Sequence, residues 1–246
     1  ALDSKGNLYL ADEWLNRISI FDKDGEFLRS WGKAGSGNGE LDRPAGLAIS
    51  GDGTLFLSDG RNHRVQKFTL DGAYIGQFGS AGSGPGEFNM PWGISLGPDG
   101  LVYVADWRND RIQQFTPDGE WQASFGQSGS GVGQFNRPNS VCADADGDIY
   151  VADWLNGRVQ VLSPEGRFVA QMLGDHAISR WGKEKLMSNP DMVRQRALAI
   201  ADDPDYELRF SQPCSVKLDR QVRIAVLENV SGRIQVYVKS KDPVLV

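Results

Sequence analysis

The stretch YVADWLNGRVQVL (residues 150–162) recurs along the chain and decides how the whole sequence is organised. Earlier copies are YLADEWLNRISIF (9–21), FLSDGRNHRVQKF (56–68) and YVADWRNDRIQQF (103–115), and a weaker copy is AVLENVSGRIQVY (225–237). The first four copies follow one another every 47 residues, and the fifth arrives 28 residues late. A fixed period of this length indicates supersecondary units that stack on one another.

Every copy holds an acidic residue that is followed five positions later by an arginine. A guanidinium matches the geometry of a carboxylate, so such a pair would fix the loop between its two members. Because the pair recurs in every unit, we interpret it as a structural lock, with direct ligand contact as the alternative. The pairs are Asp12 and Arg17, Asp59 and Arg64, Asp106 and Arg111, Asp153 and Arg158, and Glu228 and Arg233.

One unit, residues 91–137, shows how each repeat is built. PWGISLG, LVYVAD, RIQQF and EWQASFG are four short segments rich in β-branched and aromatic residues, separated by turns such as PDG. This pattern predicts an antiparallel meander of four strands. One such sheet is too small to cover its own faces, and radial stacking of four-stranded sheets gives a β-propeller. We therefore expect an all-β fold.

The strand-opening prolines, the D-x-x-N-x-R-[IV]-Q segment and the GSGxGxF connector together resemble the NHL repeat. The resemblance covers the chain except for residues 174–210, and it implies a six-bladed β-propeller that acts as a binding platform. This chain holds about five repeats, so we expect 1–246 to form one propeller domain that lacks roughly one N-terminal repeat. A five-bladed ring closed by residues 242–246 is the alternative.

Segment 174–210 interrupts the repeats and carries helix signals. Ile178, Trp181 and Leu186 recur at helical spacing, and each of the pairs Asn189-Pro190 and Asp203-Pro204 looks like an N-cap before a first-turn proline. We predict two or three short helices inserted between blades. They would cover or flank the face that carries the Asp-to-Arg loops, or else shield one edge of the ring.

The loops between acid and arginine differ from unit to unit, which makes them candidates for binding. A propeller presents these loops together on one face, around the mouth of its channel. Tryptophan and arginine are enriched at interaction hot spots. We therefore predict a ligand-binding face that includes Trp14, Arg61, Trp107, Arg108 and Trp154, against the alternative that the indoles only pack on neighbouring loops.

Composition and chemical motifs limit the other possibilities. The net charge is −6, which weighs against an extended nucleic-acid surface. GSGPGEF (82–88) lacks the Gly-Lys-Ser/Thr ending of a phosphate loop, and DADGD (144–148) lacks the distal glutamate of a calcium loop. Two histidines, His63 and His176, hardly suffice for a zinc site. Cys142 and Cys214 suggest free thiols. We therefore expect no catalytic residue, metal or cofactor.

Three functions remain open. The first is a non-catalytic propeller that binds a protein or peptide through its Trp- and Arg-rich loop face. The second is a propeller enzyme, a lyase or a lactonase-like hydrolase, with a metal in the central channel. The third is RNA binding, which some NHL platforms perform. The sequence has no apolar run of the ~18 residues that a membrane span needs, so we expect no membrane insertion. It opens inside a repeat, so the compartment is left undetermined.

Overall fold

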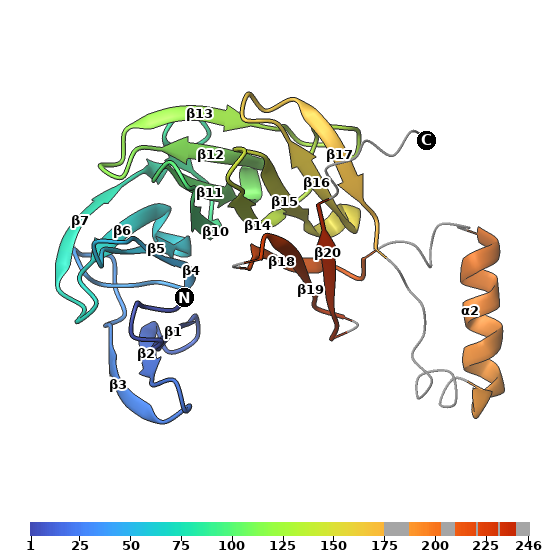
Figure 1. The fold of residues 1–246 in the computed structure, drawn as a ribbon, viewed down its shortest axis with the longest axis horizontal. Coiled ribbons are helices and arrows are strands. Elements are labelled where there is room, and N and C mark those ends of the chain that lie inside the picture. Colours follow the sequence, from blue (N-terminus) through green and yellow to red (C-terminus); the bar gives the residue numbers. More distant parts are fainter. Residues whose placement is uncertain (175–186, 203–209, 220, 231, 240–246) are drawn as a thin grey trace.

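The computed structural model describes residues 1–174, 187–202, 210–219, 221–230 and 232–239. Within these residues the chain forms five antiparallel sheets, which are arranged as blades around inner strands (Figure 1). This confirms the predicted β-propeller. The blade number is five rather than the six of the resemblance. None of the helices in the described residues is long and apolar enough to cross a membrane.

The third blade shows the unit in full. It consists of β10 (Pro91–Leu96), β11 (Val102–Asp106), β12 (Arg111–Phe115) and β13 (Trp121–Phe125), hydrogen-bonded in sequence order. These strands coincide with the four predicted segments of residues 91–137. Proline opens the inner strand, where its missing N–H costs no ladder bond.

The other blades repeat this order. The first has β1 (Leu8–Asp12), β2 (Arg17–Phe21) and β3 (Phe27–Trp31); the second has β4 (Pro44–Ile49), β5 (Leu55–Asp59), β6 (Arg64–Phe68) and β7 (Tyr74–Phe78); the fourth has β14 (Pro138–Ala143), β15 (Ile149–Asp153), β16 (Arg158–Leu162) and β17 (Phe168–Met172); the fifth has β18 (Pro213–Leu218), β19 (Arg223–Glu228) and β20 (Ile234–Val238). Leu2 adds an isolated bridge to Leu8 beside β1.

The hydrophobic core lies between the blades. All five residues of β11 and all five of β15 are buried, because both faces of these strands pack against a neighbouring blade. Between the second and third blades, Phe115 packs against Phe78 and Phe88, with ring centroids 4.9 and 5.4 Å apart. A single four-stranded sheet could not bury both of its faces in this way, so each repeat needs its neighbours.

Glycine-rich connectors join the outer strand of one blade to the inner strand of the next. In the connector that follows the second blade, β8 (Ser80–Ala81) and β9 (Glu87–Phe88) form a short parallel pair that the sequence did not indicate. Gly79 has φ +89°, and the Phe88 ring occupies the space where a Cβ would stand. These glycines therefore serve tight turns and close packing.

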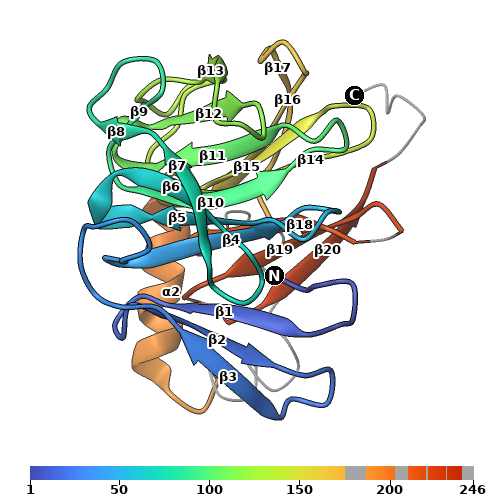
Figure 2. The ribbon, with the colours of Figure 1, turned by 90° about the vertical axis from the view of Figure 1, so that its left-hand side faces the viewer.

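The inner strands β4, β10, β14 and β18 pack one against the next around the channel. The turned view shows the first three blades stacked from bottom to top (Figure 2). Helix α2 (Pro190–Asp202) lies beside the arc of blades and does not cover its loops (Figure 1). It begins as predicted, since Asn189 Oδ1 accepts from the N–H groups of Asp191 and Met192. Ile178, Trp181, Leu186 and the Asp203-Pro204 pair lie outside the described residues.

Candidate functional site

A hydrogen-bonded frame fixes the turn between the second and third strands of each central blade. In the third blade, the Asp106 carboxylate is completely buried and accepts four hydrogen bonds. They come from Asn89 N at 2.7 Å, Asn109 Nδ2 at 2.9 Å, Arg111 Nε at 2.8 Å and Gln113 Nε2 at 3.1 Å. The sequence motif D-x-x-N-x-R-x-Q is therefore one connected network.

The arginine of this frame divides its donors between the acid and the connector. Arg111 offers only Nε to Asp106, whereas its terminal nitrogens donate to the carbonyls of Ser83, Gly84 and Glu87 at 2.8 Å. Arg111 therefore does not bind the Asp106 carboxylate in a bidentate manner. Burial raises the pKa of Asp106, and the hydrogen bonds from Asn89, Asn109 and Arg111 oppose that rise.

The same frame stands in the second and fourth blades and is weaker at both ends of the arc. Arg64 and Arg158 lie 2.9 and 2.8 Å from Asp59 and Asp153. In the first blade Arg17 is 3.9 Å from Asp12, and in the fifth Arg233 is 3.4 Å from Glu228. The frame holds the loop backbone in place, so the side chains of the loop are left to differ.

Each framed turn is a short 3-10 helix, of which the last residue, an asparagine, belongs to the frame while the first two side chains do not. These helices are η1 (Gly60–Asn62), η2 (Trp107–Asn109) and η3 (Trp154–Asn156), and each ends on a residue in the left-handed conformation. Trp107 and Trp154 consequently lie on neighbouring blades with ring centroids 6.1 Å apart. Trp92, at the start of β10, lies 6.0 Å from Trp107 on its other side.

Arginines surround this row of three indoles. The guanidinium of Arg137 lies 4.9 Å from the Trp107 ring, and that of Arg108 lies 5.7 Å from it. Both distances are within cation–π range. A pocket of about 320 Å³ opens here; we call it the aromatic pocket, and its lining residues are Arg43, Met90, Trp92, Trp107, Arg108, Asn139, Trp154 and Asn229.

The predicted site residues are not all brought together. Trp107, Arg108 and Trp154 line the aromatic pocket. Trp14 lies at its margin, 74% exposed, with Arg43 stacked 5.1 Å from its ring. Arg61 is exposed on η1 and does not line the pocket.

Sequence reasoning missed Arg43, Met90, Trp92 and Arg137. They flank the prolines that open the inner strands, and Arg43, Met90 and Arg137 share a positive φ of 54°, 56° and 57°. A non-glycine residue in this conformation is uncommon and draws attention to a position. In the sequence, the available signal was that these residues lie directly beside the prolines that recur in each repeat.

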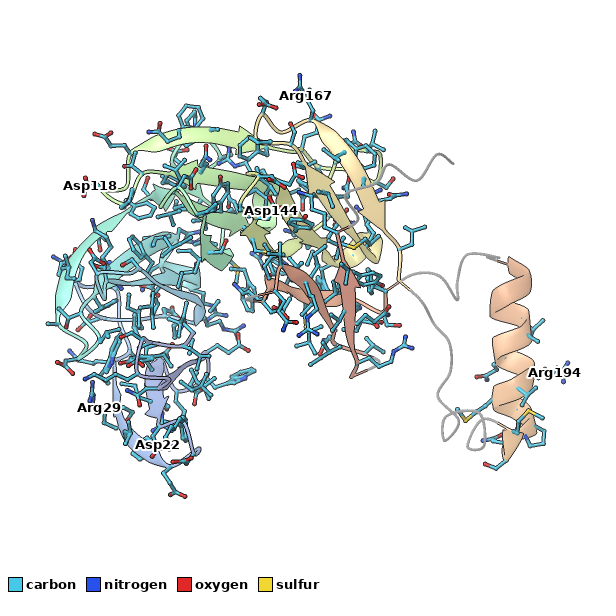
Figure 3. All side chains as sticks on the ribbon, viewed as in Figure 1. Asp22, Arg29, Asp118, Asp144, Arg167 and Arg194 are labelled. Atoms are coloured by element: carbon cyan, nitrogen blue, oxygen red, sulfur yellow. The ribbon has the colours of Figure 1, made fainter. Side chains whose placement is uncertain are left out.

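Two motifs with a metal-like composition have other partners. Asp144, Asp146 and Asp148 converge on the Lys239 ammonium, each at 2.8 Å, so a tethered cation already occupies the centre of the acidic loop. Figure 3 shows Asp144 toward the inside of the arc, whereas Asp118 and Arg167 lie on its outer rim. His63 is half-buried, not simply solvated, and its Nδ1 accepts from Met90 N at 3.2 Å.

In the part of the chain that the structure describes, the channel side chains are not the ligands that a metal needs. In the described residues, no group of three His, Cys, Asp or Glu side chains is placed to hold an ion. Lys217 instead brings an ammonium group to the channel, and a cation there opposes the binding of a second one. This donor set does not fit the channel metal of the enzyme alternative.

Fold and frame together define a β-propeller whose blades each carry a framed turn. The NHL repeat model matches residues 41–68, 88–115 and 135–162, which contain the first three strands of the three central blades. The chain is therefore a β-propeller whose three central blades contain NHL repeats. The RING finger protein nhl-1 of Caenorhabditis elegans is 47% identical over 47 residues, which is 19% of this chain and 5% of that protein.

Solved structures share the fold at low sequence identity. Virginiamycin B lyase from Staphylococcus aureus superposes with a TM-score of 0.60 at 16% identity, covering 99% of this chain and 69% of the lyase. The gluconolactonase XC5397 from Xanthomonas campestris gives a TM-score of 0.62 at 17% identity, covering 93% of this chain and 68% of that one. A chain of the nidogen–laminin complex gives 0.59 at 16% identity, with 95% and 76% covered. At these identities the likeness concerns the fold alone.

Proposed function

We propose that this protein is a non-catalytic scaffold that binds a protein or peptide ligand through the aromatic pocket. The observation that carries the proposal is the row of Trp92, Trp107 and Trp154, flanked by arginines at cation–π distance, at the edge of an open pocket. Large aromatic and Arg side chains dominate the energetics of protein interfaces. The positions equivalent to Trp107 and Trp154 hold Glu13 and Gly60 in the first two blades, whereas the acid and the arginine of the frame recur in all of them.

The chemistry of the pocket favours a ligand that combines acidic and apolar side chains. Arg43, Arg108 and Arg137 gather at the pocket although the protein as a whole is acidic, with a net charge of −6. Trp154 Nε1 is buried and has no hydrogen-bond partner within the described ranges, so a ligand oxygen there would satisfy it. A carboxylate next to an apolar side chain meets both requirements.

The test is a peptide-display selection against the whole chain, followed by affinity measurements on the selected peptides. We expect the selected peptides to be acidic and to contain an aromatic or aliphatic anchor. Trp107→Ala should weaken their binding by roughly 30-fold. This factor corresponds to about 2 kcal/mol of binding free energy, which is typical of a hot-spot residue. Trp121→Ala is the matched control, because Trp121 lies on the outer strand β13, away from the pocket.

Two outcomes would count against the proposal. One is the absence of any peptide whose binding depends on Trp107; the other is an equal loss of binding in the Trp121→Ala control. Circular dichroism of each variant separates loss of binding from loss of fold, since Trp107 stands on a turn whose frame does not use its side chain.

The enzyme and RNA alternatives are each tested by one measurement. The fold likeness to a lyase and a gluconolactonase motivates the first, while the channel donor set described above does not support it. Elemental analysis that finds a stoichiometric metal in the purified protein would favour it. Arginines beside aromatic rings also suit stacked bases. RNA binding that weakens steeply as the salt concentration rises would therefore favour the RNA alternative.

A further inference from the structure

One position of the repeat faces the channel and differs from the second blade to the fifth. It lies four residues after the proline that opens each inner strand, and it is occupied by Ala48, Ser95, Cys142 and Lys217. All four residues line a single cavity of about 500 Å³, which we call the channel cavity. Unlike the frame residues, this layer places one hydroxyl, one thiol and one amine at equivalent points, so the channel is chemically asymmetric.

Lys217 is a channel cation without a carboxylate. Its Nζ reaches across from β18 to the Ile94 carbonyl of β10, at 3.4 Å, and within the described residues it forms no ion pair. Its side chain is exposed to the channel, yet the surrounding inner strands crowd it, and this burial lowers its pKa. An ammonium group with one long hydrogen bond retains donors for a ligand.

Ser95 and Cys142 supply neutral donors to the same cavity. Ser95 directly follows Ile94, is 7% exposed, and its buried Oγ has no hydrogen-bond partner among the described residues. A buried hydroxyl without a partner lowers stability, and a ligand acceptor would remove that cost. Burial raises the pKa of Cys142 to about 12, so this side chain is a neutral thiol at physiological pH.

Ala1 also lines the cavity, and its terminal amine donates to the Tyr9 carbonyl at 2.9 Å. The other side chains of the lining are apolar and include Leu47, Ile49, Leu96 and Leu218. The cavity therefore joins one positive charge and two neutral donors to a hydrocarbon wall. A dianion such as phosphate would leave a second charge uncompensated among these side chains, which is costly. A monoanion with an apolar body matches both parts of the lining.

We propose that the channel cavity binds a small monocarboxylate with an apolar tail. The carboxylate accepts from Lys217 Nζ and Ser95 Oγ, and the tail packs on the leucines and Ile49. The cavity volume lies in the range of small-molecule sites. This site is separate from the aromatic pocket and does not depend on the peptide proposal.

The experiment titrates octanoate and its shorter homologues into the whole chain by calorimetry and by ligand-observed NMR. 1-Octanol serves as the probe without charge, and inorganic phosphate as the probe without a tail. We expect octanoate to bind more tightly than either. Lys217→Met should reduce its affinity about 10- to 100-fold, as expected for a hydrogen bond to a charged group. Ser95→Ala should reduce it by a smaller factor.

Lys23→Met is the matched control, because Lys23 pairs with Asp24 on an exposed turn far from the channel, and it should leave octanoate binding unchanged. Three results overturn the proposal: no carboxylate of the series binds; Lys217→Met binds octanoate as the parent does; or octanol or phosphate binds as tightly as octanoate. The Lys217→Met substitution removes the amine and keeps a long, unbranched side chain. Circular dichroism checks that this variant is folded.

Discussion

Asp106 and Arg111 face each other across the β11–β12 pair, and the carboxylate that Arg111 contacts at 2.8 Å is completely removed from solvent. Asp106→Asn would leave the Arg111 guanidinium, only 13% exposed, without its counter-charge. Loss of one partner of a buried pair costs about 3–5 kcal/mol. We expect a stability loss of that size in urea denaturation.

The first blade offers the control for this prediction. Asp12 and Arg17 are 3.9 Å apart and 31% and 43% exposed, so Asp12→Asn should cost about 0–1 kcal/mol. Equal losses of stability in the two variants would show that burial of the acid–arginine pair does not increase its contribution to stability.

Gly93 lies where two inner strands approach each other closely. A Cβ there would stand 2.5 Å from Asn139 O and 2.7 Å from the Ser140 Cα, both backbone atoms of β14 that cannot rotate away. Gly93→Ala should therefore lower stability by about 1–3 kcal/mol. Gly51 has open space around its Cβ position and no positive φ, so Gly51→Ala should be neutral or slightly stabilising. Thermal unfolding of the two variants gives the comparison, and a harmless Gly93→Ala would contradict the close packing of β10 and β14.

The two cysteines should react at different rates. Cys142 is 6% exposed and burial raises its pKa to about 12, whereas Cys214 is half-buried and its pKa is raised to a lesser extent. Since the thiolate is the reactive form, iodoacetamide should modify Cys214 first. Mass spectrometry of the single-cysteine variants Cys214→Ser and Cys142→Ser measures each rate separately. Equal rates would show that the channel thiol is less shielded than the structure indicates.

Lys239 ties the last strand to the fourth blade through Asp144, Asp146 and Asp148. Burial acts to raise the pKa of Asp144, but hydrogen bonds from Lys239 and Tyr150 lower it below its usual 3.8. The tie is therefore intact above the usual aspartate pKa and is lost as the pH falls through the lowered value. Hydrogen bonding to the three carboxylates raises the pKa of Lys239, so alkaline conditions should not break it until that higher pKa is reached.

Amide hydrogen exchange measures this tie directly. Lys239→Met should speed exchange in residues 234–238 at neutral pH, and acidification of the parent protein well below pH ~4, through the lowered pKa of Asp144, should do the same. Lys5→Met, at an exposed position on the first blade, should leave exchange in residues 234–238 unchanged, both at neutral pH and on acidification. Unchanged exchange in Lys239→Met would mean that β20 is held by its pairing with β19 alone.

The repeat made the blades predictable, because strand ends, turns and acid–arginine spacing all recur with one period. Phe115 and its counterparts could be assigned to a core on alternation alone. The aromatic pocket was only half predictable. Trp107 and Trp154 stand on the turns that the motif marks, but Trp92 and Arg137 reach the same place from beside a proline, and only the stacking of neighbouring blades brings these segments together.

The channel layer was less predictable still. Ser95 and Lys217 are 122 residues apart and meet because β10 and β18 both face the channel. The period places them at equivalent positions of their units, but the 28 extra residues before the fifth unit hide that equivalence. The tie formed by Lys239 depends on the side chain of one unit reaching another, which no local pattern encodes.

The frame bonds its connector through main-chain carbonyls and amides, as when Arg111 and Asn109 donate to the carbonyls of Gly84 and Gly82. Main-chain atoms are the same whatever residue carries them, so these bonds do not require a matching side chain in the connector. A 47-residue unit that is duplicated or transplanted would therefore keep its own frame, whereas contacts such as Met90 N with His63 Nδ1 and Phe115 with Phe78 still depend on the unit before it. A new specificity could then arise by recombining whole units that match at these few side-chain contacts.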